Sequence, residues 1–309
     1  MRLQASHNYA QKHYHGLYFG ISVFNKDWQV RDRSVGGRMK RLPNQDITLI
    51  QPNQTILVFG NIYGHRDVKQ KILFNHPNVL RERNINFYYW DNPHIPHLLY
   101  HNPANPKAHK NWCRMVHNHI HRQPNTISRM TQSVERINQQ LRSLSQGVIR
   151  TWRDLNPYWR DVKRRSMTAL ICPSGDRTFQ HHYGITRNEW CREWCDQLEQ
   201  MGYRVMIRLK PGRELRQHPH RLCDQLVSNN VGITVSNHST VAIESMMSGV
   251  PAVVTGVNPA GQLGTPGEEF KQTSQLRPVE MDQLIAWCEQ LLQDDYHKQE
   301  VYNGSWMAS

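Results

Sequence analysis

The sequence lacks long apolar runs. No run reaches the ~18 apolar residues of a membrane-spanning helix, although the chain has 309 residues. Residues 1–16 also lack the apolar segment of a secretory signal. These two absences predict a cytoplasmic protein without a transmembrane segment. The length favours two domains, because a single core rarely grows to this size.

Cysteine is scarce, and its spacing does not indicate a metal-binding domain. Only Cys191 and Cys195 lie one helical turn apart, and no second Cys/His pair at zinc-finger spacing accompanies them. That pair either binds a metal or packs on a helix face, and we favour packing. We therefore expect reduced structural thiols at all six positions, which are 113, 172, 191, 195, 223 and 288.

Acidic residues are few in the first half of the chain. Residues 1–166 contain 26 Lys and Arg against 9 Asp and Glu, a balance of +17. Residues 167–309 contain 12 against 16, a balance of −4, which gives the net charge of +13. Excess positive charge on one half is typical of proteins with a polyanionic partner. A basic composition without functional meaning is the alternative, which the asymmetry weakens.

Short β-rich runs alternate with helical segments in the first half. A helix-length segment at 65–77 separates the second run from the third, which predicts a βαβ unit and a parallel sheet. The segment 109–121 fits a helix or a strand. A long polar stretch at 126–153 is mostly helical in pattern. The basic segment 154–166 follows it and is expected to connect the two domains. The three runs are 16–24, 55–61 and 84–90.

The second half shows repeated β-then-α units of about 30 residues, the pattern of an open, doubly wound parallel sheet. The predicted strands are 167–175, 203–212, 231–237 and 250–256, and the predicted helices are 188–202, 213–230, 238–249 and 281–295. We therefore expect an α/β protein of two Rossmann-like domains with a cleft between them. The boundaries are 1–153 for a basic N-terminal domain, 154–166 for a linker and 167–309 for a C-terminal Rossmann-like domain.

Polar residues follow three predicted strands of the second half, where a doubly wound sheet binds its ligands. The turn at the end of the first of these strands, 167–175, offers a hydroxyl, backbone N–H groups and a cation. Arg208 and Lys210 alternate on an extended segment, so both cations can face one diphosphate. The third turn opens a helix whose dipole favours phosphate, and Glu244 lies one turn into it. The remaining candidate residues of this diphosphate-binding site are Ser174, Gly175, Arg177, Ser236, His238, Ser239 and Thr240.

Plainer roles exist for several of these residues. Ser239 or Thr240 can be a helix N-cap. Arg208 and Lys210 can lie on a solvated strand end, and Glu244 can be an exposed helix residue. Convergence of all of them at adjacent strand ends favours the binding site.

The string VSNHSTVAIESMMSGVPAVVTG (235–256) resembles the donor-domain signature of GT-B glycosyltransferases, with a Ser/Thr-rich helix start, a Glu one turn later and a Gly-Val-Pro turn. The preceding IRLKPG is similar to the basic strand end of capsule- and sialic-acid-type transferases and related phage proteins. The resemblance covers about 168–260. It implies that Glu244 binds ribose, that Arg208, Lys210, Ser239 and Thr240 hold the diphosphate, and that neither a metal nor a cofactor is needed. The chain lacks the Glu-x7-Glu pattern of retaining enzymes, so the stereochemical outcome stays open.

In the first half, GNIYGHRD, NFYYWDNPHIP and CRMVHNHIH resemble the motif order of phage-encoded glycosyltransferase-like proteins. Asp91 ends an apolar strand, where a carboxylate can take a proton from an acceptor hydroxyl, or simply form a turn. On a helix, Arg114 and Asn118 share a face and can line the acceptor side. The alternating histidines at 117, 119 and 121 are weak metal candidates.

The leading hypothesis is transfer of a sugar from a nucleotide-sugar to a polyanionic acceptor presented by the basic half. Hydroxymethylpyrimidine in phage DNA fits this charge, which would place the enzyme in the host cytoplasm. The base would leave the stack to be reached. One alternative is a glycosyltransferase of capsule or lipopolysaccharide synthesis at an anionic membrane surface. Another is a non-catalytic nucleic-acid-binding protein on a Rossmann scaffold.

Overall fold

Two compact units make up the chain. The computed structural model describes residues 20–24, 39–41, 55–59, 81–82, 84–91, 93–95, 112–123, 132–144, 166–209, 222–297, 300–301 and 306. Unit 1 comprises Met1–Pro96, Asn102–Ile137 and Leu291–Ser309, and unit 2 comprises His97–His101 and Asn138–Gln290. The chain thus returns to unit 1 near its C-terminus, whereas the predicted boundaries keep 167–309 together.

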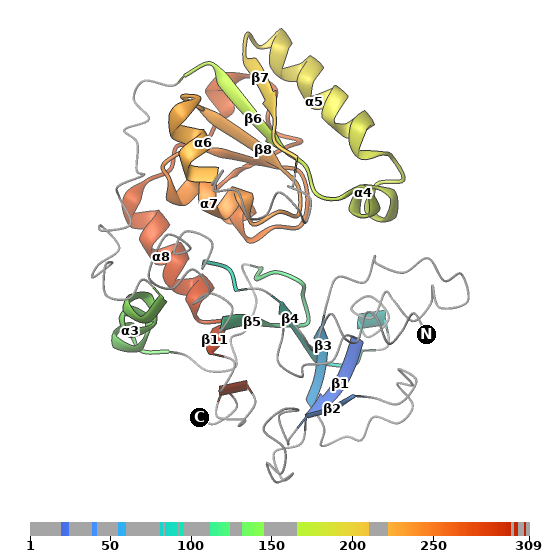
Figure 1. Cartoon of the computed structure of the whole chain (residues 1–309), viewed down its shortest axis with the longest axis vertical. Helices are drawn as coiled ribbons and strands as arrows, with labels where there is room; N and C mark the ends of the chain where they lie inside the picture. The colour runs from blue at the N-terminus through green and yellow to red at the C-terminus, as the bar shows by residue number, and fades with distance from the viewer. Residues whose placement is uncertain are drawn as a thin grey trace. The chain divides into compact units, whose positions relative to one another are not determined.

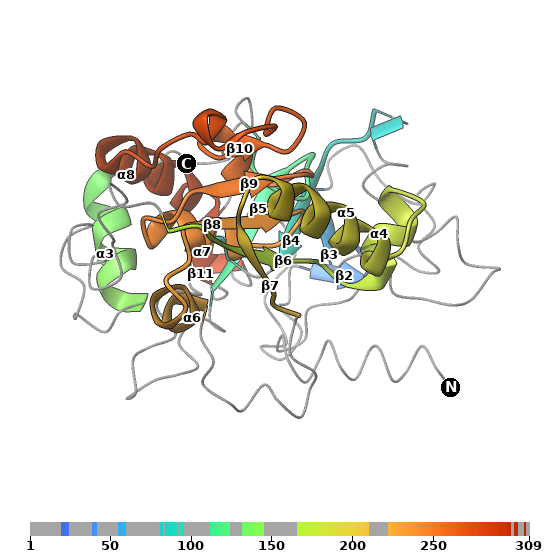
Figure 2. The same ribbon diagram turned by 90° about the horizontal axis from the view of Figure 1, so that it is seen from above.

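The sheet of unit 2 has five strands in the order β10-β9-β8-β6-β7, and all of its pairings are parallel (Figures 1 and 2). Counted along the chain, the order is 2-1-3-4-5, which is one of the two common doubly wound arrangements. The first two strands along the chain lie side by side, and the third lies on the other side of the first. The strands are β6 (Thr168–Cys172), β7 (Arg204–Ile207), β8 (Ile233–Ser236), β9 (Ala252–Val254) and β10 (Thr265–Pro266).

Helices cover both faces of this sheet (Figures 1 and 2). On one face, α4 (Asp176–His182) and α5 (Arg187–Gln200) contribute Phe179, Trp190 and Leu198 to a core with side chains of β6, β8 and β9. On the other face, α6 (Leu222–Ser228) and α7 (Val241–Met247) pack on Leu170 and Cys172 of β6. The predicted α/β fold with a parallel sheet is confirmed in this unit.

Local sequence signals fix the ends of α5. Thr186 caps its N-terminus in a capping box, because its hydroxyl accepts from the N–H of Glu189 while the Glu189 carboxylate accepts from the N–H of Thr186. Beyond its C-terminus, Gly202 has a φ of 83°, a conformation that glycine adopts without a steric penalty. Two 3-10 turns, η9 (Pro259–Gln262) and η10 (Thr273–Gln275), precede α8 (Met281–Leu292).

The sheet of unit 1 is mixed, with the order β11-β5-β4-β3-β1-β2. The predicted parallel pairing is confirmed for β3 and β4. The other pairings among the described strands are antiparallel. The strands are β1 (Gly20–Phe24), β2 (Met39–Arg41), β3 (Thr55–Phe59), β4 (Phe87–Asp91), β5 (Trp112–His117) and β11 (Asp295–His297).

In unit 1 the structure decides between the helix and the strand considered for one segment, and it adds a strand that the sequence does not predict. The segment that fits a helix or a strand forms β5, so Arg114 and Asn118 do not share a helical face. Strand β11 pairs with β5 through Asp295, Tyr296 and His297. Five of the six β5 residues are buried, and burial on both faces favours a strand over an amphipathic helix.

Part of the predicted organisation lies outside the described residues, namely the helix at 65–77 and nearly all of the linker at 154–166. Within the long polar stretch, α3 occupies Val134–Leu144. Within the described part of the chain, no helix has the length and apolar character needed to cross a bilayer. The five described cysteines are free thiols.

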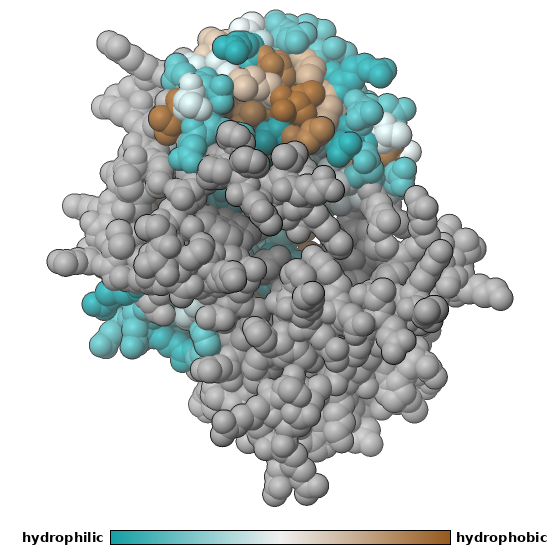
Figure 3. Space-filling view, in the orientation of Figure 1, coloured by the Kyte–Doolittle hydropathy of each residue, from teal (hydrophilic) through white to brown (hydrophobic). Residues whose placement is uncertain are grey.

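Unit 2 exposes several large apolar side chains, and Figure 3 shows apolar residues gathered on its visible face. Ile207 is 48% exposed and Leu209 is 52% exposed. Both belong to the end of β7, which is an edge strand of the sheet and therefore has a neighbouring strand on one side only. The other exposed apolar residues are Met167, Val227 and Val257.

Candidate nucleotide site at the carboxyl edge of the parallel sheet

Arg208 and Glu244 interact electrostatically near the end of β6. Arg208 directly follows β7, and its N–H donates to the carbonyl of Ile171 in β6 at 2.8 Å. Burial raises the pKa of Glu244 to about 7, and the positive charge of Arg208 partly opposes this rise. Both groups also act on Cys172, whose thiol pKa is raised to about 12 mainly by burial. A cation from β7 and a carboxylate from α7 therefore meet beside the last residue of β6.

Ser174 and Asn237 join the ends of β6 and β8, the two strands at which the sheet reverses its order. The backbone N–H of Ser174 donates to Asn237 Oδ1 at 3.1 Å, and its hydroxyl donates to the same oxygen at 2.6 Å. The sequence predicts that the turn after β6 offers this N–H to a phosphate. The N–H instead holds the Asn237 side chain, which is fully buried.

His238 and Tyr183 form a second polar pair at this edge. His238 Nδ1 lies 3.0 Å from the carbonyl of Val257, and Nε2 lies 3.1 Å from the Tyr183 hydroxyl. Burial lowers the pKa of His238 and raises that of Tyr183. The neutral forms fit this geometry, because a His238 Nδ1–H donated to Val257 leaves Nε2 to accept from the Tyr183 hydroxyl. The same hydroxyl lies 3.3 Å from the carbonyl of Thr255.

Gly256 permits this pair to form. A Cβ atom at residue 256 would lie 2.4 Å from the Tyr183 hydroxyl and 3.1 Å from the nearest His238 ring atoms. Both distances are below normal van der Waals contact, so the side chains at 183 and 238 need a glycine here. The sequence predicts neither Tyr183 nor Gly256 as a site residue, since their contact joins positions 73 residues apart in sequence.

Asn258 holds the loop that leads into α7. Its Nδ2 donates to the carbonyls of Asn237 and Ser239 at 2.9 and 2.6 Å. The Ser239 hydroxyl accepts from the N–H of Val241 at 3.3 Å, which is the plain capping role considered for this residue. Thr240 is the N-cap residue of α7 but makes no side-chain capping bond.

The remaining predicted donor residues divide into three groups. Ser236 is buried, and its hydroxyl has no hydrogen-bond partner within the described part of the chain. Gly175 is exposed at the N-cap of α4. Lys210 lies outside the described residues, as does the side chain of Arg177. The structure thus brings Arg208 and Glu244 together, and places Ser174, His238 and Ser239 at strand ends of the same edge.

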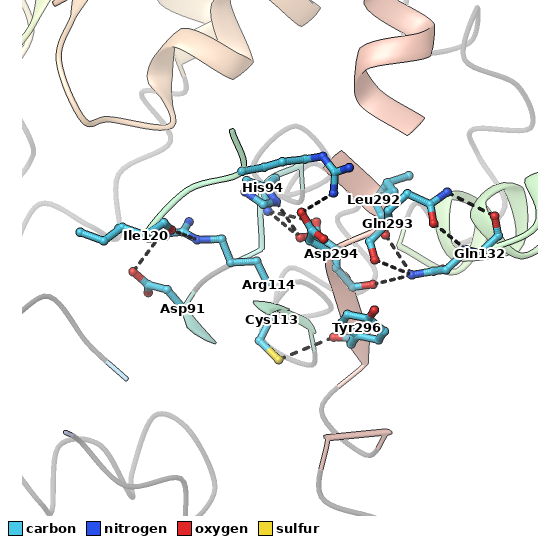
Figure 4. Close-up of polar contacts among 12 residues, drawn as sticks. Asp91, His94, Cys113, Arg114, Ile120, Gln132, Leu292, Gln293, Asp294 and Tyr296 are labelled. Atoms are coloured by element: carbon cyan, nitrogen blue, oxygen red, sulfur yellow. Dashed lines mark hydrogen bonds and ion pairs between the residues drawn. The ribbon is translucent and has the colours of Figure 1, made fainter. Parts of the chain in front are cut away.

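In unit 1, the predicted base Asp91 lies beside Arg114 (Figure 4). Their strands pair in register, and Arg114 Nη2 lies 3.3 Å from Asp91 Oδ2. The Tyr89 hydroxyl donates to the same oxygen at 3.2 Å. Arg114 is buried and also donates to the carbonyl of Ile120. The base role of Asp91 stays a prediction.

Asn118 lies at the other end of β4 from Asp91. Its Oδ1 accepts from the N–H of Phe87 at 2.8 Å, and its Nδ2 donates to Asn86 Oδ1 at 2.8 Å. Its φ of 55° is the left-handed conformation that asparagine tolerates best after glycine. Arg114 and Asn118 are therefore separated along the strand, and the contacts of Asn118 close the turn after β5.

A buried His–Asp pair has no counterpart among the sequence predictions. The Asp295 carboxylate accepts from the backbone N–H of His94 at 3.0 and 3.1 Å, and His94 Nδ1 lies 3.1 Å from Asp295 Oδ1. Both side chains are fully buried. The neighbouring Asp294 pairs with Arg122 at 2.7 Å (Figure 4). No sequence signal links His94 to Asp295, because the two partners lie 201 positions apart.

The described part of the chain contains no group of three or more His, Cys, Asp or Glu residues arranged to hold a metal. His119 has a lowered pKa because it is partly buried and lies near Arg81 and His117. Cys191 and Cys195 face the core of unit 2 as free thiols.

No protein-family model, curated protein or solved structure matches the chain. Its function is therefore inferred from the geometry of the two units.

Proposed function

We propose that unit 2 binds a nucleotide-sugar at the carboxyl edge of its parallel sheet and that the protein is a metal-independent glycosyltransferase. The observation that carries this proposal is the position of Arg208 at the carboxyl edge, where its N–H donates to the Ile171 carbonyl of β6 at 2.8 Å and its positive charge acts on Glu244. Doubly wound sheets bind ligands outside the carboxyl ends of their strands, where the strand order reverses. A cation at that position supports a diphosphate, and a carboxylate one helix turn away supports ribose hydroxyls.

The chemistry of the edge favours a polar, anionic ligand over an apolar one. The described side chains there carry hydroxyl, amide, imidazole and guanidinium groups (Ser174, Arg208, Asn237 and His238). Charge-assisted hydrogen bonds from a guanidinium stabilise a diphosphate leaving group without a metal. The fixed dipoles around it need little reorganisation during the reaction.

The acceptor is proposed to be a polyanion, with DNA favoured. The charge balance of +17 over residues 1–166 supports this choice, because phosphate contacts release counterions and increase affinity. If DNA is the acceptor, the logarithm of the association constant should fall linearly with the logarithm of the salt concentration. A flat dependence on salt for duplex DNA, with tight binding to anionic vesicles, would favour the capsule or lipopolysaccharide acceptor.

The donor site is tested by calorimetry on two arginine variants. The nucleotide-sugar that most increases the melting temperature in a screen serves as the ligand. Arg208→Ala should weaken binding by more than ~1 kcal/mol, as expected for the loss of a charge-assisted contact. Arg204→Ala is the matched control, because it removes the same charge from the opposite end of β7. Equal affinities of the two variants would remove the donor-site assignment.

Catalysis is tested separately from binding. The protein is incubated with the best donor and hydroxymethylated DNA, and the DNA is analysed by mass spectrometry for an added hexose. Release of free sugar without DNA would support a transferase with another acceptor. Nucleotide-sugar binding with neither transfer nor hydrolysis would instead support the non-catalytic alternative.

A further inference from the structure

Asn237 has an unused hydrogen-bond donor in a buried position. Its side chain is 0% exposed, and Nδ2 has no hydrogen-bond partner among the residues that the structure describes. The orientation of the amide is fixed, because Oδ1 accepts two hydrogen bonds from Ser174 and must therefore be the oxygen. A buried donor without a partner costs about 1–3 kcal/mol. The position thus needs an acceptor atom from outside the described part of the protein.

A second unused group lies on the adjacent strand end. Ser236 pairs with Val254, so the next residues, Asn237 and Thr255, continue the same register across β8 and β9. Register partners in neighbouring strands lie on the same face of a sheet, which places their side chains on one face. The Thr255 hydroxyl is buried and has no hydrogen-bond partner in the described segments. Two neighbouring strand ends therefore present unfilled hydrogen-bonding groups.

The charge beside this pair identifies the class of ligand. In the strand order β8-β6-β7, the ends that carry Asn237 and Arg208 lie on either side of the end of β6. Neighbouring strands are ~4.8 Å apart, so the two backbones are separated by about 10 Å. By the alternation of side chains, Asn237 shares the face of Val235 and Arg208 shares the face of Met206. A diphosphate that crosses the edge of the sheet at the end of β6 can therefore be contacted by one residue on each face. A neutral acceptor such as a base carbonyl would not use the positive charge of Arg208.

We propose that Asn237, oriented by Ser174, donates a hydrogen bond to a phosphoryl oxygen of the nucleoside diphosphate, and that Thr255 supplies a second contact. The inference rests on the proposed function for its choice of ligand. It adds two binding residues to the site and assigns Ser174 the role of a positioning residue for Asn237. The diphosphate would then be held from one side by the Arg208 cation and from the other by an amide.

The test compares two variants that change the unused groups with little change in size. Asn237→Asp keeps an oxygen to accept the two Ser174 bonds and replaces the donor by a charged acceptor. Thr255→Val removes the hydroxyl, and its fold should be as stable as the wild type or more stable, because no partner is lost. Calorimetry with uridine, adenosine, guanosine and cytidine diphosphates and with inorganic pyrophosphate gives the affinities. Both variants should lose about tenfold or more, the factor for a hydrogen bond to a charged group.

Asn229→Asp is the matched control for added negative charge. Asn229 follows α6 and precedes β8, so it lies at the opposite edge of the same sheet. This control should bind every probe as the wild type does. If Asn237→Asp does not fold, Thr255→Val alone decides, because the hydroxyl that it removes makes no hydrogen bond with the described residues.

The outcomes separate this inference from the proposed function. Wild-type binding of a nucleoside diphosphate with unchanged affinity in both variants would overturn the inference and leave the function standing. If the wild type binds only pyrophosphate and the variants lose this binding, the phosphoryl contact is supported and a nucleotide is excluded as the ligand. Equal losses of affinity in Asn229→Asp and Asn237→Asp would show a general effect of charge and overturn the inference. A wild-type protein that binds none of the probes would also overturn it.

Discussion

Gly256→Ala should disrupt the polar pair at the carboxyl edge of unit 2. The added Cβ would lie 2.4 Å from the Tyr183 hydroxyl, so the tyrosine has to move. Its movement breaks the contact with His238 Nε2 at 3.1 Å and the contact with the Thr255 carbonyl at 3.3 Å. Overpacking of this kind costs about 1–3 kcal/mol. We expect a loss of that size in the free energy of unfolding, measured by urea denaturation.

The atom that would clash is the Tyr183 hydroxyl oxygen, so removal of this oxygen should relieve the clash. In Tyr183→Phe the hydroxyl is absent, and a Cβ at residue 256 has more room. Alone, Tyr183→Phe should cost about 1 kcal/mol, because His238 loses a buried hydrogen-bond partner. The double variant should then be less destabilised than the sum of the two single variants, by about 1 kcal/mol or more in a double-mutant cycle.

Gly261→Ala provides the control, since nothing lies within 4 Å of a Cβ at that position. It should be neutral or slightly stabilising, because alanine restricts the unfolded chain. Strictly additive effects of Gly256→Ala and Tyr183→Phe would refute the assignment of the hydroxyl as the obstacle. So would a Gly256→Ala protein as stable as Gly261→Ala.

Three further predictions concern titratable groups. The pKa of Glu244 is raised from 4.5 to about 7, so its contribution to the free energy of unfolding is complete below pH 4.5 and is lost as the pH rises through 7. Between these two pKa values the loss is up to ~1.4 kcal/mol for each pH step of one. Glu244→Gln should flatten this part of a plot of unfolding free energy against pH. Asp295→Ala leaves buried His94 donors without an acceptor and should cost about 1–3 kcal/mol for each, which urea denaturation would detect; stability equal to the wild type would contradict the buried pairing. Asp91→Asn should abolish sugar transfer without changing donor affinity if Asp91 is the base, and an active variant would exclude that role while leaving its ion pair with Arg114 as a structural contact.

The elements of unit 2 are predictable from the sequence because each is a local pattern. The strands β6, β8 and β9 are rich in apolar and β-branched residues and are bounded by turn residues, and all of their residues are buried. Arg208 and Glu244 are predictable as neighbours for a related reason. Parallel strands place their carboxyl ends at one edge, so residues after successive strands converge even when they are distant in sequence.

Unit 1 and the finer contacts of the site cannot be predicted in the same way. Strand β11 has only three residues, and two of them are polar, so no periodicity marks it. The segment that forms β5 fits both a helix and a strand, and only its buried position in the sheet decides. Tyr183 and His238 lie 55 positions apart, so their pairing depends on the fold of the whole segment between them. Such contacts have no local signature.

Strand β11 has a consequence for how the protein reaches its native state during synthesis. The sheet of unit 1 gains this strand, and with it the Asp295 partner of His94, from the last fifteen residues of the chain. Until that segment leaves the ribosome, β5 has one edge open and the His94 loop lacks its acceptor. The continuous segment of unit 2 at 138–290 is complete earlier. During synthesis unit 1 should therefore complete its fold after unit 2, although most of unit 1 is translated first, and removal of β11 should impair unit 1 selectively.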